Sequence, residues 1–110
     1  MLVKPTVASG GLEAASPTKV GLPPGYFKVV KEGMRQSVTY GTSLGVNVPY
    51  VTAAAKTGTA EIGSGKSYVH SWSVGFFPYE HPRYAWAVVM EKGPASNTVG
   101  ATTVMRRVLD

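Results

Sequence analysis

Apolar and polar residues recur with two different periods along this 110-residue chain, and each period predicts a different kind of element. Over residues 26 to about 40, Val30, Met34 and Val38 follow one another at four-residue spacing, while charged residues occupy the other faces. An apolar stripe at that spacing is typical of an amphipathic helix that packs one side against a core. The pattern therefore predicts a helix over residues 26–40.

Three later segments have the character of β-strands. They run over about 53–62, 71–77 and 84–90, and in the last two of them apolar residues stand at alternate positions. The glycine-rich stretch 63–66 predicts a tight turn after the first strand. Apolar residues also stand on both faces of these strands, which predicts a sheet that is covered on both sides.

The two ends of the chain have different patterns. Residues 1–25 are rich in Pro, Gly, Ser and Thr and predict an extended or loop lead-in. Residues 99–110 place apolar side chains at helical spacing, with Asn97 or Thr98 as a candidate N-cap, and predict a C-terminal helix packed on the sheet. One helix, three antiparallel strands and a second helix make an α+β fold, with the sheet flanked by helices.

Composition narrows the classes of function. The 11 Lys and Arg residues against 6 Asp and Glu leave a net charge of +5, but no basic cluster is interleaved with aromatics, so we expect no nucleic-acid partner. The chain has no cysteine, which excludes disulfides and thiolate catalysis. The only histidines, His70 and His81, lack metal-ligand spacing, and we expect no metal. Neither a membrane-spanning run of ~20 apolar residues nor a signal pattern is present, so we expect any anchor to lie outside these residues.

The stretch Lys56-Thr57-Gly58-Thr59 on the first predicted strand is the most informative for chemistry. Strand alternation places Lys56 and Gly58 on one side and Thr57 and Thr59 on the other. Because Gly58 lacks a Cβ, a substrate or a neighbouring backbone could approach it closely. A bare K-T-G also fits an exposed lysine at the start of a strand. Together with S-x-x-K and a Ser-Asp-Asn element, however, K-T-G marks penicillin-binding proteins and class A β-lactamases.

The wider sequence resembles class B penicillin-binding proteins. The stretches that carry the resemblance are the K-T-G region 54–61, the next two strands at 70–78 and 84–91, Lys31-Glu32-Gly33-Met34, and the Gly41-Thr42 step. The similarity covers residues 26–110 and is greatest to the elongation-type peptidoglycan D,D-transpeptidases, with the division-type subgroup close. It implies that residues 1–110 are the C-terminal portion of a penicillin-binding transpeptidase domain, with part of the β-lactamase/transpeptidase-like fold.

The resemblance also implies roles for the four motif residues. Lys56 would supply positive charge and assist proton transfer, and Thr57 and Thr59 would hold the carboxylate of a D-alanyl-D-alanine end or of a β-lactam. Gly58 would belong to the same substrate-binding strand. The backbone amide of Thr59 would form half of an oxyanion hole. Lys56 and Thr59 are thus the expected catalytic residues, peptidoglycan stem peptides and β-lactams the expected partners, and no cofactor is expected.

Two motifs of the family are not found in this sequence. The only S-x-x-K string begins at Ser16 and ends at Lys19, and the Gly and Pro residues at 21–25 prevent a helix from continuing there. No Ser-x-Asn element precedes K-T-G. We therefore expect the isolated chain to be inactive and to need a preceding part of the same domain, or a homo-oligomer or strand swap, for stability. The implied location is the extracytoplasmic face of the bacterial cytoplasmic membrane.

Three other functions remain open from the sequence. The same domain could be a non-catalytic sensor of β-lactams or muropeptides, or part of a related serine β-lactamase. A small α+β binding module with chance similarity is the third. The residues after Lys56-Thr57, which read Gly-Thr-Ala-Glu, favour the transpeptidase over the β-lactamase.

Overall fold

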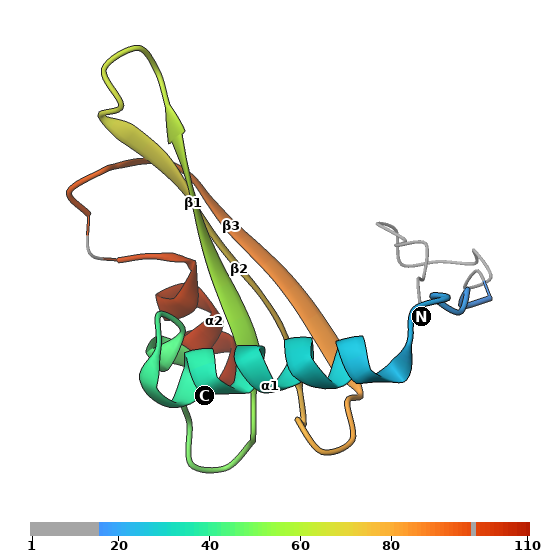
Figure 1. The fold of residues 1–110 in the computed structure, drawn as a ribbon. Coiled ribbons are helices and arrows are strands. Elements are labelled where there is room, and N and C mark those ends of the chain that lie inside the picture. The colour runs from blue at the N-terminus through green and yellow to red at the C-terminus, as the bar shows by residue number, and fades with distance from the viewer. Residues whose placement is uncertain (1–15, 98) are drawn as a thin grey trace.

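The computed structural model describes residues 16–97 and 99–110 and has the predicted α+β fold (Figure 1). Its elements in chain order are α1 (Pro24–Tyr40), the short 3-10 helix η1 (Leu44–Val46), β1 (Ala54–Ile62), β2 (Tyr68–Phe77), β3 (Tyr84–Pro94) and α2 (Ala101–Leu109). The second and third strands are longer than predicted. Most of the predicted lead-in, 1–25, lies outside the described residues, and 16–23 contain neither a helix nor an extended strand.

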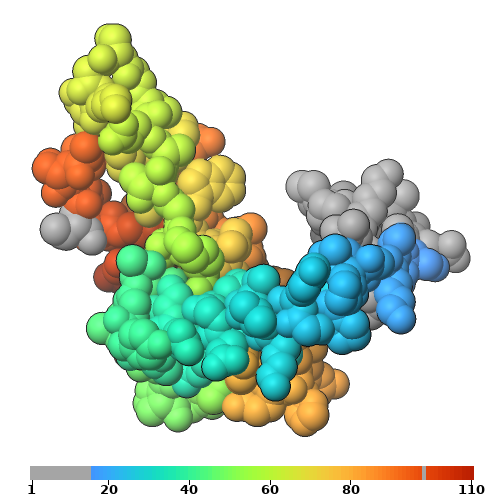
Figure 2. Space-filling view, viewed as in Figure 1, coloured from blue at the N-terminus to red at the C-terminus, as the bar shows by residue number. Residues whose placement is uncertain are grey.

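The three strands form one antiparallel sheet in the order β1-β2-β3. The β1–β2 pairing runs from Ala54 opposite Phe76 to Ile62 opposite Tyr68. In the turn between them Gly63 and Lys66 have φ angles of 83° and 50°, the left-handed conformation that a tight reversal needs. This hairpin projects beyond the rest of the molecule, as Figure 2 shows in yellow-green.

The sheet has two different faces, because residues directly opposite one another on paired strands share a face. We call the face with Ala55, Gly75 and Trp86 the covered face, and the face with Lys56 and Val74 the open face. The core lies on the covered face, where the buried residues are Val38, Val46, Ala55 and Met105, with Phe77, Trp86, Val88 and Leu109 packed against them. Helices α1 and α2 and the loop with η1 thus each contribute a side chain to this one core.

The prediction of a sheet covered on both sides is wrong for most of the open face within the described residues, although the end with Ala54 is buried. Trp72, Val74 and Val89 on the open face remain 42%, 41% and 39% exposed. The buried side chains of α1, η1 and α2 pack with Ala55 of the covered face. On the open face α1 reaches only the end with Phe76, whose ring lies under the Lys31 ammonium. Helix α1 crosses the sheet only at the end where β1 begins (Figure 1).

The apolar stripe of α1 is likewise buried at one end only. Val38 is fully buried in the core, whereas Val30, two turns earlier, is 60% exposed. The helix begins at Pro24, where the fixed φ of proline suits the first turn. It ends at Tyr40, and the backbone N–H of Gly41 donates to the carbonyl of Ser37 at 3.1 Å. No helix in the described ranges is long and apolar enough to cross a membrane.

The start of α2 differs from the prediction. Its N-cap position is Gly100, and no side chain of the helix's own segment caps it. Instead the Ser71 hydroxyl of β2 accepts the Ala101 N–H at 3.0 Å, so the strand supplies the cap. The candidate cap Asn97 accepts the Val99 N–H instead, and Thr98 lies outside the described residues. A sequence pattern cannot find a cap that comes from thirty residues away.

Candidate functional site

The K-T-G motif lies on the edge strand of the sheet. Residues Lys56 to Thr59 fall within β1, which pairs only with β2 among the described strands. The second side of this strand therefore presents backbone N–H and C=O groups that the described sheet does not pair. A ligand with an extended backbone, or another strand, could bind along this edge.

The pairing register separates the motif residues onto the two faces. Lys56 lies opposite Val74 on the open face, and Thr57 lies opposite Ser73 on the covered face. Gly58 follows Lys56 and lies opposite Trp72, and Thr59 follows Thr57. This is the alternation expected of a regular strand.

The Lys56 side chain is exposed and turns back along its own strand. Its Nζ donates to the Thr57 carbonyl oxygen at 2.6 Å. Within residues 16–97 and 99–110, the ion pairs are Lys66 with Glu61 and Arg106 with Asp110, so no described carboxylate pairs with Lys56. An ammonium without an internal counter-ion on an open edge can attract an anionic ligand.

Gly58 is not required by packing within the described chain. A Cβ added there would lie 3.5 Å from the Trp72 Cβ, which is an ordinary van der Waals contact. By contrast, a Cβ at Gly75 would lie 2.3 Å from the Trp86 indole. Among the described residues, the predicted close approach of another group to Gly58 is therefore not observed.

Thr57 contacts a residue to which the sequence analysis gave no role. Its Oγ1 is hydrogen-bonded to Oγ1 of Thr42, in the loop after α1, at 2.8 Å. The signal in the sequence was the Gly41-Thr42 step, which resembles the family, but no local pattern shows that this step reaches the motif strand. The fold brings the two threonines together from 15 positions apart.

Thr59 has different surroundings. It is exposed and lines a shallow pocket between the sheet and the segment leading to α2, together with Ser71, Met90, Gly93 and Val99. The described residues thus do not gather the four motif side chains into one cavity. They align them along one strand edge.

The two histidines and Glu61 lie in other parts of the sheet and its loops. His70 lies at the irregularity between β2 and β3, and its Nδ1 accepts the Lys92 N–H at 3.0 Å. His81 is exposed in the loop after β2. Glu61 forms an exposed ion pair with Lys66 at 3.1 Å in the projecting hairpin.

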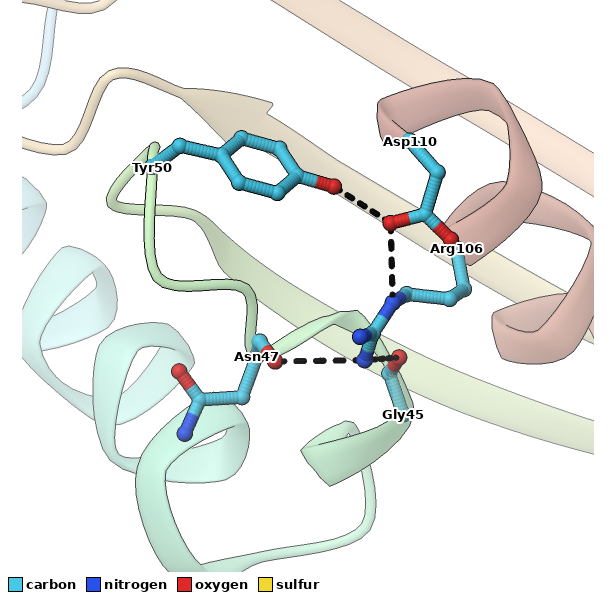
Figure 3. A network of polar contacts seen from close by, with 5 residues as sticks. All are labelled: Gly45, Asn47, Tyr50, Arg106 and Asp110. Carbon is cyan, nitrogen blue, oxygen red and sulfur yellow. Dashed lines mark hydrogen bonds and ion pairs between the residues drawn. The ribbon is translucent and has the colours of Figure 1, made fainter.

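A second polar network joins α2 to the loop that carries Thr42 (Figure 3). Arg106 donates from Nη1 to the carbonyls of Gly45 at 3.5 Å and Asn47 at 3.3 Å, and from Nε to Asp110 at 3.2 Å. The Tyr50 hydroxyl donates to the same carboxylate. This bond, followed by the contact with Arg106, lowers the pKa of Asp110, and the same bond raises the pKa of Tyr50.

The chain is similar to a known protein family. Residues 2–110 match the family model described as penicillin binding protein transpeptidase domain. No curated protein matches the chain.

Several solved transpeptidase domains are similar to it. The D,D-transpeptidase domain of a peptidoglycan glycosyltransferase from Eggerthella lenta is 32% identical, with a TM-score of 0.69 over 89% of this chain and 22% of that one. A D,D-transpeptidase domain from Legionella pneumophila is 26% identical, with a TM-score of 0.66 over 80% of this chain and 35% of that one. Penicillin-binding protein A from M. tuberculosis, as an imipenem acyl-enzyme complex, is 29% identical, with a TM-score of 0.67 over 89% of this chain and 22% of that one.

The chain therefore spans between 22% and 35% of the length of these solved chains. Its three-stranded sheet and helices have the fold of their transpeptidase domains. The family is one of acyl-transfer enzymes that bind penicillin. With a family model that matches residues 2–110, this chain belongs to the penicillin-binding protein transpeptidase domain family.

Proposed function

We propose that this chain supplies the K-T-G strand of a serine D,D-transpeptidase that cross-links peptidoglycan and is acylated by β-lactams. The observation that supports the proposal is that Lys56 to Thr59 lie on β1, an edge strand of the described sheet. The chain that contains this strand belongs to the transpeptidase domain family. In this proposal, residues 1–110 are the C-terminal portion of the domain. The substrates are a donor stem peptide and an acceptor amine, and no metal or organic cofactor takes part.

The roles of the motif residues follow from what an anionic peptide end needs. A carboxylate binds best to a cation together with hydroxyl donors, and Lys56, Thr57 and Thr59 offer these groups along 4 consecutive positions. Gly58 between them leaves room for the ligand backbone. The Thr59 amide donates to the oxyanion that develops at the scissile carbonyl, an interaction of ~3 kcal/mol in acyl-transfer enzymes.

The nucleophile must come from residues other than those of this chain. Ser16 and Lys19 lie outside any helix and are exposed, so they do not have the shared helical face on which a lysine could activate a serine. We infer that the isolated chain is not acylated. The preceding part of the same domain completes the site, and self-association or a strand swap through the β1 edge is the other way to cover it.

The setting of the reaction follows from its substrate. Peptidoglycan stem peptides are cross-linked on the extracytoplasmic face of the bacterial cytoplasmic membrane, and we place the active domain there. The similar M. tuberculosis protein forms an acyl-enzyme with imipenem, which supports β-lactams as ligands of the completed site.

The test is a grafted domain, in which this chain replaces the corresponding segment of the 32% identical Eggerthella lenta domain. We expect covalent labelling by a fluorescent penicillin, and at least tenfold slower labelling after Lys56→Met, which keeps the side-chain length without the charge. Slow release of the label indicates a transpeptidase, whereas rapid hydrolysis indicates a β-lactamase. A sensor would be labelled without transferring a peptide to an amine.

A grafted domain that folds but is never labelled would contradict the proposal. The unmodified host domain, labelled in parallel, shows that the probe and conditions are sound. The isolated chain, run beside both, should remain unlabelled.

A further inference from the structure

We propose that Thr42 is a positioning residue that sets the direction in which the Thr57 hydroxyl donates its hydrogen bond. This inference rests on the proposed function, because it assumes that Thr57 meets a ligand carboxylate. The two Oγ1 atoms lie 2.8 Å apart, a normal distance for a hydrogen bond between hydroxyls. Thr42 belongs to a loop outside the motif strand, so it adds a second element to the site.

The backbone on both sides of Thr42 is firmly held. The N–H groups of Gly41 and Ser43 both donate to the Ser37 carbonyl, at 3.1 and 3.0 Å. The Ser37 hydroxyl also donates to the Ser43 hydroxyl at 2.9 Å, and Ser43 is fully buried. A Cβ at Gly41 would lie 2.8 Å from the Ser37 Cα, so the turn is closed too tightly for a larger residue there.

The rest of the loop is fixed from the C-terminal side. Val46 is fully buried in the core, and Arg106 of α2 donates to the carbonyls of Gly45 and Asn47 (Figure 3). Thr42 is therefore the residue of this loop that is both anchored at its backbone and directed at β1. Its side chain can hold the Thr57 hydroxyl in one orientation.

The chemistry of hydroxyl groups gives this contact a direction. Each threonine hydroxyl has one proton and two acceptor lone pairs. Without a ligand, either hydroxyl can donate to the other, because the 2.8 Å distance between the two oxygen atoms does not fix the proton. A carboxylate can only accept, so Thr57 must turn its proton toward a bound anion, and Thr42 then becomes the donor to Thr57. Thr42 thus holds Thr57 while it donates to the ligand.

Because a bound anion fixes Thr42 as the donor, the contribution of Thr42 is specific to the charge of the ligand. A free carboxylate accepts a much stronger hydrogen bond from the Thr57 hydroxyl than a neutral ester does. A contact with only a structural role would affect acid and ester equally. The ratio of the two affinities is therefore the relevant quantity.

The experiment measures labelling of the grafted domain by a penicillin in its free-acid form and by the corresponding methyl ester. We expect Thr42→Val to raise the half-saturating concentration of the acid about five- to tenfold and to leave that of the ester within about twofold. Thr42→Ser keeps the hydroxyl and should restore the acid preference. Thr39→Val is the matched control, because the Thr39 hydroxyl only donates to the carbonyls of its own helix, at Arg35 and Gln36.

The outcomes separate this inference from the proposed function. A wild-type graft that is never labelled contradicts the proposed function itself. A labelled graft in which Thr42→Val leaves the acid-to-ester ratio unchanged overturns the role of Thr42 alone. If Thr42→Val does not fold, the Thr42→Ala variant gives the same ratio. Adding Thr42→Val or Thr42→Ala to Thr57→Val should change the ratio no further, and an additive loss would also overturn the inference.

Discussion

On the covered face of the sheet, Gly75 lies directly under the Trp86 indole, whereas on the open face Gly58 has only the Trp72 Cβ within reach. The two glycines are on paired strands and look alike in the sequence. Gly75 is needed because the indole, which donates from Nε1 to the Ser73 hydroxyl at 3.2 Å, occupies the space of a side chain. Gly58 borders open space. One glycine serves the core, and the other leaves the motif strand accessible.

The largest difference in stability is expected when each of the two glycines is replaced by alanine. Gly75→Ala places a Cβ 2.3 Å from the Trp86 ring and 2.5 Å from the Ala54 carbonyl, and should lower the free energy of unfolding by about 3 kcal/mol. Gly58→Ala is the matched variant and should change it by less than about 1 kcal/mol, in the stabilising direction. Urea unfolding of the grafted domain measures both. Equal losses would contradict the assignment of the two faces.

The fold could be predicted to a large extent from the sequence. The period-of-two strands and the helical stripe through Val38 gave the order of elements, because both depend on local patterns. The burial of each face could not be predicted in the same way, since Trp72 and Trp86 have equal apolar character in the sequence. Which face a helix covers is a long-range property.

The candidate site was predictable in part for the same reason. Lys56 to Thr59 could be found as a contiguous motif on a strand. The Thr42–Thr57 contact could not, because it depends on how the loop after α1 folds against β1. The Ser71 cap of α2 was missed in the same way. Contacts between distant segments are the part of the site that a single sequence does not contain.

The second prediction compares a buried with a half-exposed apolar side chain. Met105 of α2 is 3% exposed in the core, and Met105→Ala should cost about 2 to 3 kcal/mol of unfolding free energy through the cavity it leaves. Val74 on the open face is 41% exposed, and Val74→Ala should cost less than about 1 kcal/mol. The same urea titration is the measurement. A large loss at Val74 would mean that the host part of the grafted domain covers this face.

A smaller effect is expected at the junction of the covered face with α2. Ser71→Ala removes the hydroxyl that accepts the Ala101 N–H, and should cost about 1 kcal/mol. Ser64→Ala in the exposed turn after β1 is the matched control and should change little. Amide hydrogen exchange at Ala101 should increase in the first variant only. Unchanged protection there would show that the strand does not cap the helix.

The smallest expected effect concerns the exposed rim of the covered face, where Tyr50, Arg106 and Asp110 meet (Figure 3). The Asp110 pKa is lowered in the folded chain, so its contribution to stability is present above the unfolded pKa and is lost as pH falls through the folded value. The Tyr50 pKa is raised, so its contribution is present below the unfolded pKa and is lost as pH rises through the folded value.

The network should therefore stabilise the chain most between about pH 4 and pH 10, the ordinary values of the two groups. Tyr50→Phe removes the hydroxyl that causes the largest part of both shifts. We expect this variant to unfold at slightly lower urea near pH 7 and to differ less from wild type at pH 3. Because both groups are exposed, water and salt compete with the bond, and the effect should shrink in 1 M salt. An equal stability difference between variant and wild type at pH 3 and pH 7 would mean that the Tyr50 side chain stabilises this rim by packing. The hydrogen bond to the Asp110 carboxylate would then contribute nothing measurable.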